Sequence, residues 1–214
     1  MKGMKAHIYR TFVLLVGLAV AACSGTSGRP AASFFEQAPQ SPNNNAQRVD
    51  DVLVDFGKPD MQGRWWIVND GVMGGISKSE LVYSGEGTAI FRGYVSIENN
   101  GGFASTRTEP KPLGVSNNHT GFQLRVRGDG KAYQFRVEAR TQWGDVTYRY
   151  RFVTRAGEWM TIEVPFKQLQ PVWRGRILNN APPASPRAMR QLGFMISDGQ
   201  EGPFQFEFER ITVD

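Results

Sequence analysis

The strongest constraint on the fold of this chain is a period-two alternation of apolar and polar side chains after residue 49. Strands that bury one face have this pattern, because successive side chains point to opposite faces of a sheet. No window has the 3.6-residue period of a helix. Short strands separated by Gly, Asn, Asp and Pro turns indicate an all-β fold, an antiparallel β-sandwich or jelly roll formed by one domain over 49–214. The alternation is clearest at Phe122, Leu124 and Val126 and recurs over 89–97, 133–137, 148–152 and 204–208.

The first 22 residues have the pattern of a lipoprotein signal peptide. Three basic residues without an acidic one precede an apolar run, Thr11–Ala22, which ends in small residues before Cys23. The run is shorter than the roughly 20 apolar residues of a membrane-spanning helix. Residues 20–23 resemble the bacterial lipobox, in which the cysteine is acylated and becomes the new N-terminus, and two or more acyl chains anchor a protein stably. The alternative is an ordinary cleaved signal with an incidental cysteine.

The residue after the cysteine and the segment that follows predict where the domain works. In lipoproteins of this type an Asp after the cysteine favours retention in the inner membrane, and this chain has Ser24. We therefore expect an exported protein on the outer membrane, facing the periplasm, where the source has two membranes. Residues 23–48, which begin at the lipidated cysteine, are rich in Ser, Pro, Gly, Asn and Gln, and predict a flexible tether.

Composition excludes several classes of function. The chain has 25 Lys and Arg against 20 Asp and Glu, and the signal holds three of the basic residues, which leaves 22 against 20. This balance offers no basic stripe for nucleic acid. Cys23 is the only cysteine, so acylation leaves no thiol nucleophile, disulfide or cysteine-based zinc site. Beyond the signal His119 is the only histidine, and without a Gly-x-Ser-x-Gly elbow we predict no catalytic residue.

Two glycine-rich segments carry the most specific signals, Trp65–Ser77 and Glu98–Ser105. Glycine is used where the backbone turns sharply or approaches another group closely, so the two loops are predicted to form one rim. No Gly-Lys-Ser/Thr follows, which argues against a phosphate-binding loop. A third segment, Arg127–Tyr133, contains Asp129-Gly130 between two alternating strands, and predicts a hairpin turn in place of an adhesion motif.

Together with Gly193–Asp198, these segments resemble the motifs of the complex I intermediate-associated protein 30 family, in the same order, from about Val52 to Val213. The resemblance implies a galactose-binding-like β-sandwich. It also implies a non-enzymatic assembly or chaperone-like factor that binds a protein, for example during the assembly of a respiratory complex. The family's mitochondrial members work on the matrix side, whereas this chain has an export signal, so we do not expect an identical role. We predict a membrane-anchored module that binds a protein of the cell envelope, identity unknown.

Two other functions stay open. Aromatic side chains beside Asn, Asp and Arg suit a sugar-binding groove, so a module that binds wall or exported glycan is the alternative, with Trp143 and Trp173 as exposed candidates. An envelope hydrolase would need a carboxylate pair from among Asp70, Glu98 and Asp129.

The predicted cofactors are none, apart from a structural Ca²⁺ held by oxygen ligands of Glu98, Asn99 and Asp129. Asn100 and Arg127 are expected to be partly exposed, whereas Leu124 is expected in the core. For any one residue of the motifs, a place in the core or in a tight turn is the plainer interpretation. The predicted binding residues are Trp66, Asn69, Asp70, Met73, Gly74, Gly75, Ser77, Glu98, Asn99, Asn100, Gly101, Gly102, Phe103, Ser105, Arg127, Asp129, Lys131 and Tyr133.

Overall fold

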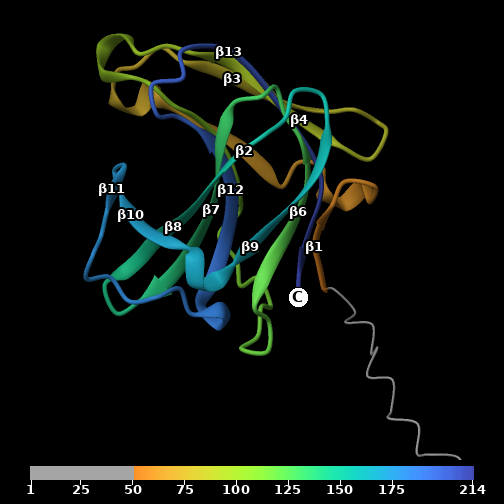
Figure 1. Ribbon diagram of the computed structural model, residues 1–214, viewed down its shortest axis with the longest axis vertical. Coiled ribbons are helices and arrows are strands. Elements are labelled where there is room, and N and C mark those ends of the chain that lie inside the picture. Colours follow the sequence, from red (N-terminus) through yellow and green to blue (C-terminus); the bar gives the residue numbers. More distant parts are fainter. Residues whose placement is uncertain (1–50) are drawn as a thin grey trace, which may run out of the picture. The chain divides into compact units, whose positions relative to one another are not determined.

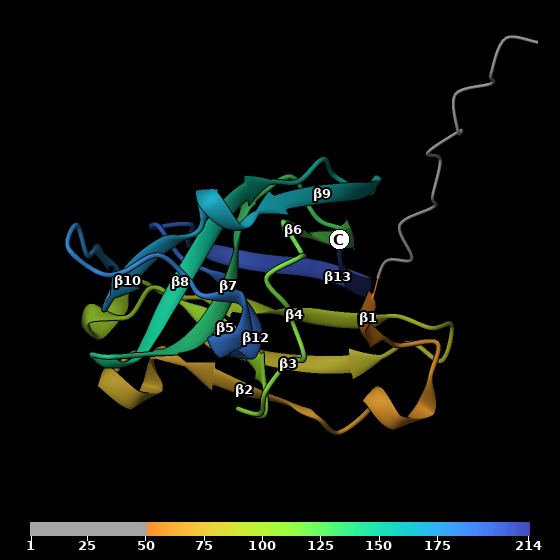
Figure 2. The same cartoon turned by 90° about the horizontal axis from the view of Figure 1, so that it is seen from below.

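The structure, a computed structural model, describes residues 51–214, which form two antiparallel sheets packed face to face (Figures 1 and 2). The predicted antiparallel β-sandwich is therefore confirmed. Helical structure between residues 51 and 214 is limited to five short 3₁₀ turns. No helix within this range is both long enough and apolar enough to span a bilayer. The predicted signal 1–22, Cys23 and the tether to residue 48 lie outside the described residues.

The first sheet has six strands in the order β3-β4-β13-β6-β9, with β1 paired to β13. The last strand, β13, is the longest, with 12 residues. Its first half pairs with β4, and its second half pairs with β1. The bounds are β1 Asp51–Asp55, β3 Lys78–Tyr83, β4 Ala89–Val95, β6 Gly121–Arg127, β9 Trp159–Pro165 and β13 Gly202–Val213.

The second sheet has seven strands in the order β11-β10-β8-β7-β12-β5-β2. Its strands are β2 Trp65–Asn69, β5 Ala104–Thr108, β7 Ala132–Thr141, β8 Gly144–Val153, β10 Gln170–Trp173, β11 Arg176–Ile177 and β12 Met189–Ile196. The 3₁₀ turns are η1 Pro59–Met61, η2 Asp70–Met73, η3 Glu98–Asn100, η4 Phe166–Gln168 and η5 Pro186–Ala188.

The core between the sheets is built mainly from aromatic rings. Phe206 of β13 lies at its centre, with ring centroids 4.5 Å from Tyr133 and 4.8 Å from Phe194 on the opposite sheet. Leu124 is fully buried, as the alternation predicts. Each large apolar side chain buried in this way contributes about 1.5–3 kcal/mol, so the facing aromatic rows hold the sheets together.

The prediction that Asp129-Gly130 forms a hairpin between its flanking strands is wrong in one respect. Gly130 does lie in a turn, with a φ of 92°. However, β6 pairs with β13 and β9 in the first sheet, whereas β7 pairs with β8 and β12 in the second. The turn therefore carries the chain from one sheet to the other. Alternation marks a strand but does not identify the neighbour with which it pairs.

The long strand β13 separates two ends of the sandwich. Gly202 at its start pairs with Val95, directly before the Glu98–Ser105 motif, and Val213 at its end pairs with Asp51. Twelve residues at about 3.3 Å each place these ends about 35 Å apart. Figure 1 shows the C-terminus beside β1, away from η2 and η3. The motif loops therefore lie at the end opposite to Asp51.

Candidate functional site

The two motif loops are joined by one buried carboxylate. Asp70, at the start of η2, has no exposed surface. Its carboxylate accepts hydrogen bonds from the backbone N–H of Ser77 at 3.0 Å, of Gly102 at 2.7 Å and of Phe103 at 3.2 Å. It also accepts one from the Ser77 hydroxyl. Asp70 thus fixes loop 70–77 to the segment after η3.

The glycines of both motifs make room for this carboxylate. A Cβ atom at Gly75 would lie 2.4 Å from Cγ of Asp70, and one at Gly101 would lie 2.7 Å from its Oδ2. Real Cβ atoms do not approach other atoms this closely, so the buried aspartate requires glycine at both positions. The paired glycines therefore pack around Asp70.

The pKa of Asp70 lies below its ordinary value. Burial is the largest single influence and raises the pKa. The hydrogen bonds from Ser77, Gly102 and Phe103 lower the pKa, and together they outweigh the effect of burial. The carboxylate is therefore charged at neutral pH. In this state it can accept hydrogen bonds on both oxygens, which suits a structural anchor.

Around this anchor the loops expose a group of apolar side chains that we call the apolar rim. Exposure is 76% for Val72, 56% for Met73, 47% for Ile76 and 53% for Ile97. In both Figure 1 and Figure 2 the turns η2 and η3 lie side by side at one end of the sandwich. Hydrogen bonds between Ser77 and Ser96 also join the two loops. Exposed apolar groups gathered on neighbouring loops are typical of a contact surface for another molecule.

The structure divides the predicted motif residues by exposure. Met73, Gly74, Glu98, Asn99 and Asn100 are exposed, and Trp66 is 36% exposed on the outer face of β2. Four others, Asp70, Ser77, Ser105 and Tyr133, are buried. A buried side chain offers no surface to a partner, so we reassign these four from contact residues to residues that shape the site. The rest of the set is half-buried: Asn69, Gly75, Gly101, Gly102, Phe103, Arg127, Asp129 and Lys131.

The third motif forms a separate cluster, at the turn between β6 and β7. The carboxylate of Asp129 accepts hydrogen bonds from the Lys131 N–H, the Tyr133 hydroxyl and the Gln205 N–H. Arg127, with its side chain 42% exposed as expected, forms an ion pair with the buried Glu207. These contacts are internal, so the side chains of this motif stabilise the crossing between the sheets.

The carboxylates do not form a catalytic pair that involves Asp70, because that side chain is buried and hydrogen-bonded on both oxygens. Within residues 51–214 no group of three or more His, Cys, Asp or Glu side chains is placed to hold a metal ion. The calcium site at Glu98, Asn99 and Asp129 stays a prediction.

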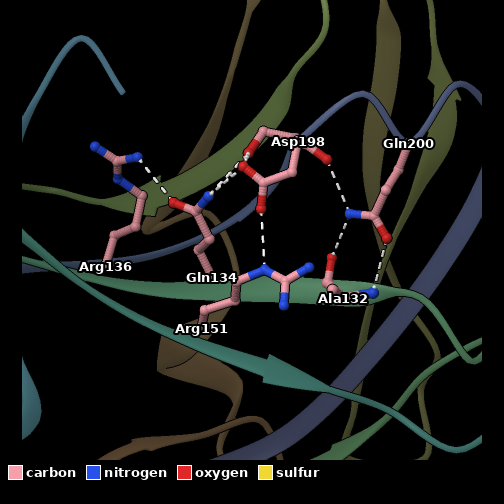
Figure 3. A network of polar contacts seen from close by, with 7 residues as sticks. Ala132, Gln134, Arg136, Arg151, Asp198 and Gln200 are labelled. Atoms are coloured by element: carbon pink, nitrogen blue, oxygen red, sulfur yellow. Dashed lines mark hydrogen bonds and ion pairs between the residues drawn. The ribbon is translucent and has the colours of Figure 1, made fainter. Parts of the chain in front are cut away.

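A polar network on the outer face of the second sheet holds the loop between β12 and β13. In Figure 3, Asp198 lies between Gln134 and Arg151, with Arg151 Nε 3.1 Å from Oδ2 of Asp198. Gln200 exchanges two hydrogen bonds with the backbone of Ala132, at 2.9 and 2.8 Å. Arg136 points toward the side-chain oxygen of Gln134. The network fixes the loop to β7 and β8.

Sequence reasoning missed two sets of residues. Val72, Ile76 and Ile97 are not among the predicted binding residues. An apolar side chain beside a glycine turn and outside any alternating run is nevertheless a signal of exposure. The arginines of β5, β7 and β8, which include Arg107 and Arg136, occupy polar positions of their strands. That pattern predicts side chains exposed to solvent. Only the pairing of the strands shows that these arginines lie close together.

Solved structures share the fold. The family 11 carbohydrate-binding module of the cellulase Lic26A-Cel5E from Clostridium thermocellum matches with a TM-score of 0.59 and 15% identity, over 77% of this chain and 93% of that one. The same module in complex with a β-1,3-1,4-mixed-linked tetrasaccharide matches with a TM-score of 0.58 and 16% identity, over 77% and 94%. An agarase matches with a TM-score of 0.52 and 11% identity, over 76% of this chain and 24% of the agarase. At these identities the likeness shows the fold alone.

Sequence comparison identifies relatives. The mitochondrial complex I intermediate-associated protein 30 of Drosophila melanogaster is 25% identical over 186 residues, which covers 77% of this chain and 62% of that protein. A mitochondrial relative of that description in Caenorhabditis elegans is 27% identical over 158 residues, 65% of this chain and 46% of that protein. The chain thus spans about half to three fifths of the length of these relatives.

Residues 54–208 match the sequence profile of complex I intermediate-associated protein 30 (CIA30). The match contains both motif loops, the Asp70 anchor and the turn at Asp129. It also contains the greater part of both sheets. This chain therefore belongs to the complex I intermediate-associated protein 30 family.

Proposed function

We propose that the chain is a non-enzymatic, membrane-anchored module that binds a protein partner and acts as an assembly or chaperone-like factor in the cell envelope. The relatives carry in their name an association with intermediates of complex I. The chain spans only part of those relatives, so we carry over the class of function, protein assembly, and leave the identity of the partner to experiment.

The observation that carries this proposal is the apolar rim. Val72, Met73, Ile76 and Ile97 are each about half exposed or more. Burial of such a side chain against a partner contributes about 1.5–3 kcal/mol, and a few well-packed, desolvated side chains dominate the affinity of most protein interfaces. The Asp70 anchor holds the two loops in place, so little conformational entropy is lost when the rim docks.

The placement of the rim fits a lipid-anchored protein. The predicted tether leads from Cys23 to the domain, and the described chain begins at Asp51, at the end of the sandwich opposite to the rim. A domain attached in this way can turn the rim away from the membrane, toward a partner in the periplasm. We propose this arrangement together with export and outer-membrane anchoring.

Carbohydrate binding is the second candidate, favoured by one observation on the surface. Trp143 and Trp173 are 52% and 58% exposed, as the sequence predicts for a sugar-binding protein. However, each tryptophan lies at the tip of a different hairpin, β7–β8 or β10–β11. The Arg174 guanidinium lies 4.7 Å from the centre of the Trp173 ring and covers one of its faces. A ring covered in this way is a poor platform for stacking a sugar, so we rank protein binding first.

Site-specific photo-crosslinking in intact cells tests the proposal. A photoreactive amino acid at Met73, within the rim, should capture a defined polypeptide. The same amino acid at Trp143, equally exposed on a hairpin tip, is the matched control and should not capture it. Equal capture at both positions, or capture at Trp143 alone, would remove the rim as the docking surface. Saturable binding of polysaccharide that is lost in Trp143→Ala or Trp173→Ala would place glycan binding first.

Fractionation tests the membrane anchor separately. The Cys23→Ser variant should lose the acyl chains, and we expect it to move from the membrane to the soluble fraction or to stay uncleaved. A variant that remains with membranes after high-salt washing, as the native protein does, would contradict lipid anchoring.

A further inference from the structure

Three arginines lie in one row across the outer face of the second sheet, the face turned away from the core. The strand register places Arg149 of β8 opposite Arg136 of β7, and Arg136 opposite Gly193 of β12. Gly193 in turn lies opposite Arg107 of β5. Neighbouring strands are about 4.8 Å apart, so Arg107 and Arg136 stand about 10 Å apart at their Cα atoms, with only a glycine between them.

The glycine leaves a small pocket between these side chains. A Cβ atom at Gly193 would lie 2.7 Å from the carbonyl oxygen of Thr106, which excludes any side chain at this position. Arg107, Arg136, Glu138 and Gln191 contribute to the lining, and the volume is about 30 Å³. A water molecule needs about 10–15 Å³ on this measure, so the pocket has room for two or three water molecules and is too small for a sugar ring.

None of the three arginines forms an ion pair within the described residues. No carboxylate oxygen between residues 51 and 214 lies within 4.0 Å of Arg107, Arg136 or Arg149, whereas Arg151 on the same sheet pairs with Asp198. Arg136 contacts only neutral atoms, Oε1 of Gln134 at 3.4 Å (Figure 3) and Sδ of Met195 at 3.0 Å. The Nε atom of Arg149 is buried without a hydrogen-bond partner within the described part of the chain.

The surroundings disfavour this concentration of positive charge. Burial and the nearby charges of Arg107 and Arg149 lower the pKa of Arg136 to about 10. Glu138 is the only acid in the pocket lining; burial raises its pKa, and its charge acts on Arg107 without forming an ion pair with it. Buried charges are costly unless they are paired, so a row of three arginines without an ion pair, two of which line one small pocket, points to an anion supplied from outside the domain.

We propose that this arginine pocket, lined by Arg107 and Arg136 beside Gly193 and with Arg149 next in the row, binds a single oxyanion head group, a carboxylate or a phosphate. The planar guanidinium group donates two parallel hydrogen bonds to either group, and such charge-assisted pairs are the strong ones. The pocket lies on the face of the sheet and is a different surface from the apolar rim. The oxyanion site therefore stands independently of the proposed function.

The test is a titration of the mature protein with inorganic phosphate and, separately, with acetate, at pH 7 and constant ionic strength. NMR signals of the arginine side-chain Nε–H groups report where the anion binds. We expect saturable shifts of Arg107, Arg136 or Arg149, with chloride at the same concentration giving none. A higher affinity for phosphate indicates a phosphorylated ligand, and a higher affinity for acetate indicates an acidic side chain.

Two pocket variants and one control complete the experiment. Arg136→Gln and Arg107→Gln should each weaken binding about tenfold or more, the loss expected for a charged hydrogen bond. Arg107 is at the edge of the row, so its variant serves if Arg136→Gln does not fold. Arg92→Gln, at an exposed arginine of the other sheet paired with Glu80, should bind as the native protein does. No saturable binding of either anion, or binding unchanged in both pocket variants, would overturn the proposal.

Discussion

Asp70, which is fully buried, and Arg136, which is half-buried on the outer face of the second sheet, are charged residues in opposite situations. The Asp70 carboxylate accepts four hydrogen bonds from two segments of the chain, and its pKa lies below the ordinary value. The Arg136 guanidinium contacts neutral atoms beside other arginines, and its pKa is lowered to about 10, which disfavours the charge. The charge of Asp70 is satisfied by hydrogen bonds within the domain and organises the motif loops. The charge of Arg136 has no ion-pair partner in the described residues, which is the basis for proposing a ligand there. The prominent sequence motif therefore builds a scaffold, and the less prominent arginines form a candidate site.

The largest effect is expected for Asp70→Ala, which tests the scaffold half of this comparison. The change leaves four donors without their acceptor in a buried position, and we expect a loss of about 3–5 kcal/mol in the free energy of unfolding. Urea denaturation of the purified protein measures it. Leu124→Ala, a plain core deletion expected to cost about 2–5 kcal/mol, is the benchmark. A cost below 1 kcal/mol for Asp70→Ala would mean that the loops do not depend on the anchor.

Arg127→Ala should have an intermediate effect. Its guanidinium pairs with Glu207, which is only 6% exposed and would be left as a buried charge without its cation. We expect a loss of about 1–3 kcal/mol, more than the roughly 0.5 kcal/mol typical of a surface substitution. Asn100→Ala, at an exposed position, should stay within about 1 kcal/mol. Equal costs for the two variants in urea denaturation would contradict the role of the ion pair.

The pH dependence of the Asp70→Asn variant sharpens the comparison further. Because folding lowers the pKa of Asp70 below its unfolded value of 3.8, the stabilisation is fully present above that value. It is lost as the pH falls through the folded pKa. The stability difference between the native protein and Asp70→Asn should therefore be constant above about pH 5 and shrink in more acidic solution. A difference that grows below pH 4 would give the opposite sign and contradict the assignment.

Only a small stability effect is expected for Arg136→Met, the counterpart of Asp70→Ala. Replacement of a buried charge by an apolar side chain of similar length is often neutral or stabilising. We expect the free energy of unfolding to stay within about 1 kcal/mol of the native value or to rise, measured in buffer without phosphate or carboxylate. A loss as large as that of Leu124→Ala would show that the domain itself satisfies Arg136, and the contrast with Asp70 would disappear.

The sequence predicts the fold class well and the site only in part. Alternation at Phe122, Leu124 and Val126 depends on local geometry, which a sequence shows directly. The pairing of strands depends on contacts between distant residues, which is why β6 and β7 were expected in one hairpin although they lie in different sheets. For the same reason the row that joins Arg107 to Arg136 through Gly193 has no signal in the sequence.

The burial of single motif residues is similarly hidden. Asp beside Gly is a common turn former at the surface, so Asp70 has the appearance of an exposed residue. Asp70 is buried because it contacts Gly102, which lies 32 positions further along the chain, and the sequence does not show such a distant contact. The apolar rim was missed because Val72 and Ile97 lie next to residues with stronger turn signals. The division of these segments into anchor and surface therefore required the structure.

The central claim is that Asp70 holds the motif loops and the apolar rim contacts the partner, and one paired measurement on Met73→Asp tests it most directly. Met73 is 56% exposed and receives no side-chain hydrogen bond in the described residues, so urea denaturation should give the native stability within about 0.5 kcal/mol. Capture of the partner in intact cells should be lost. Val52→Asp, an exposed apolar position at the opposite end, should retain capture. Native capture by Met73→Asp, with its fold intact, would contradict the account.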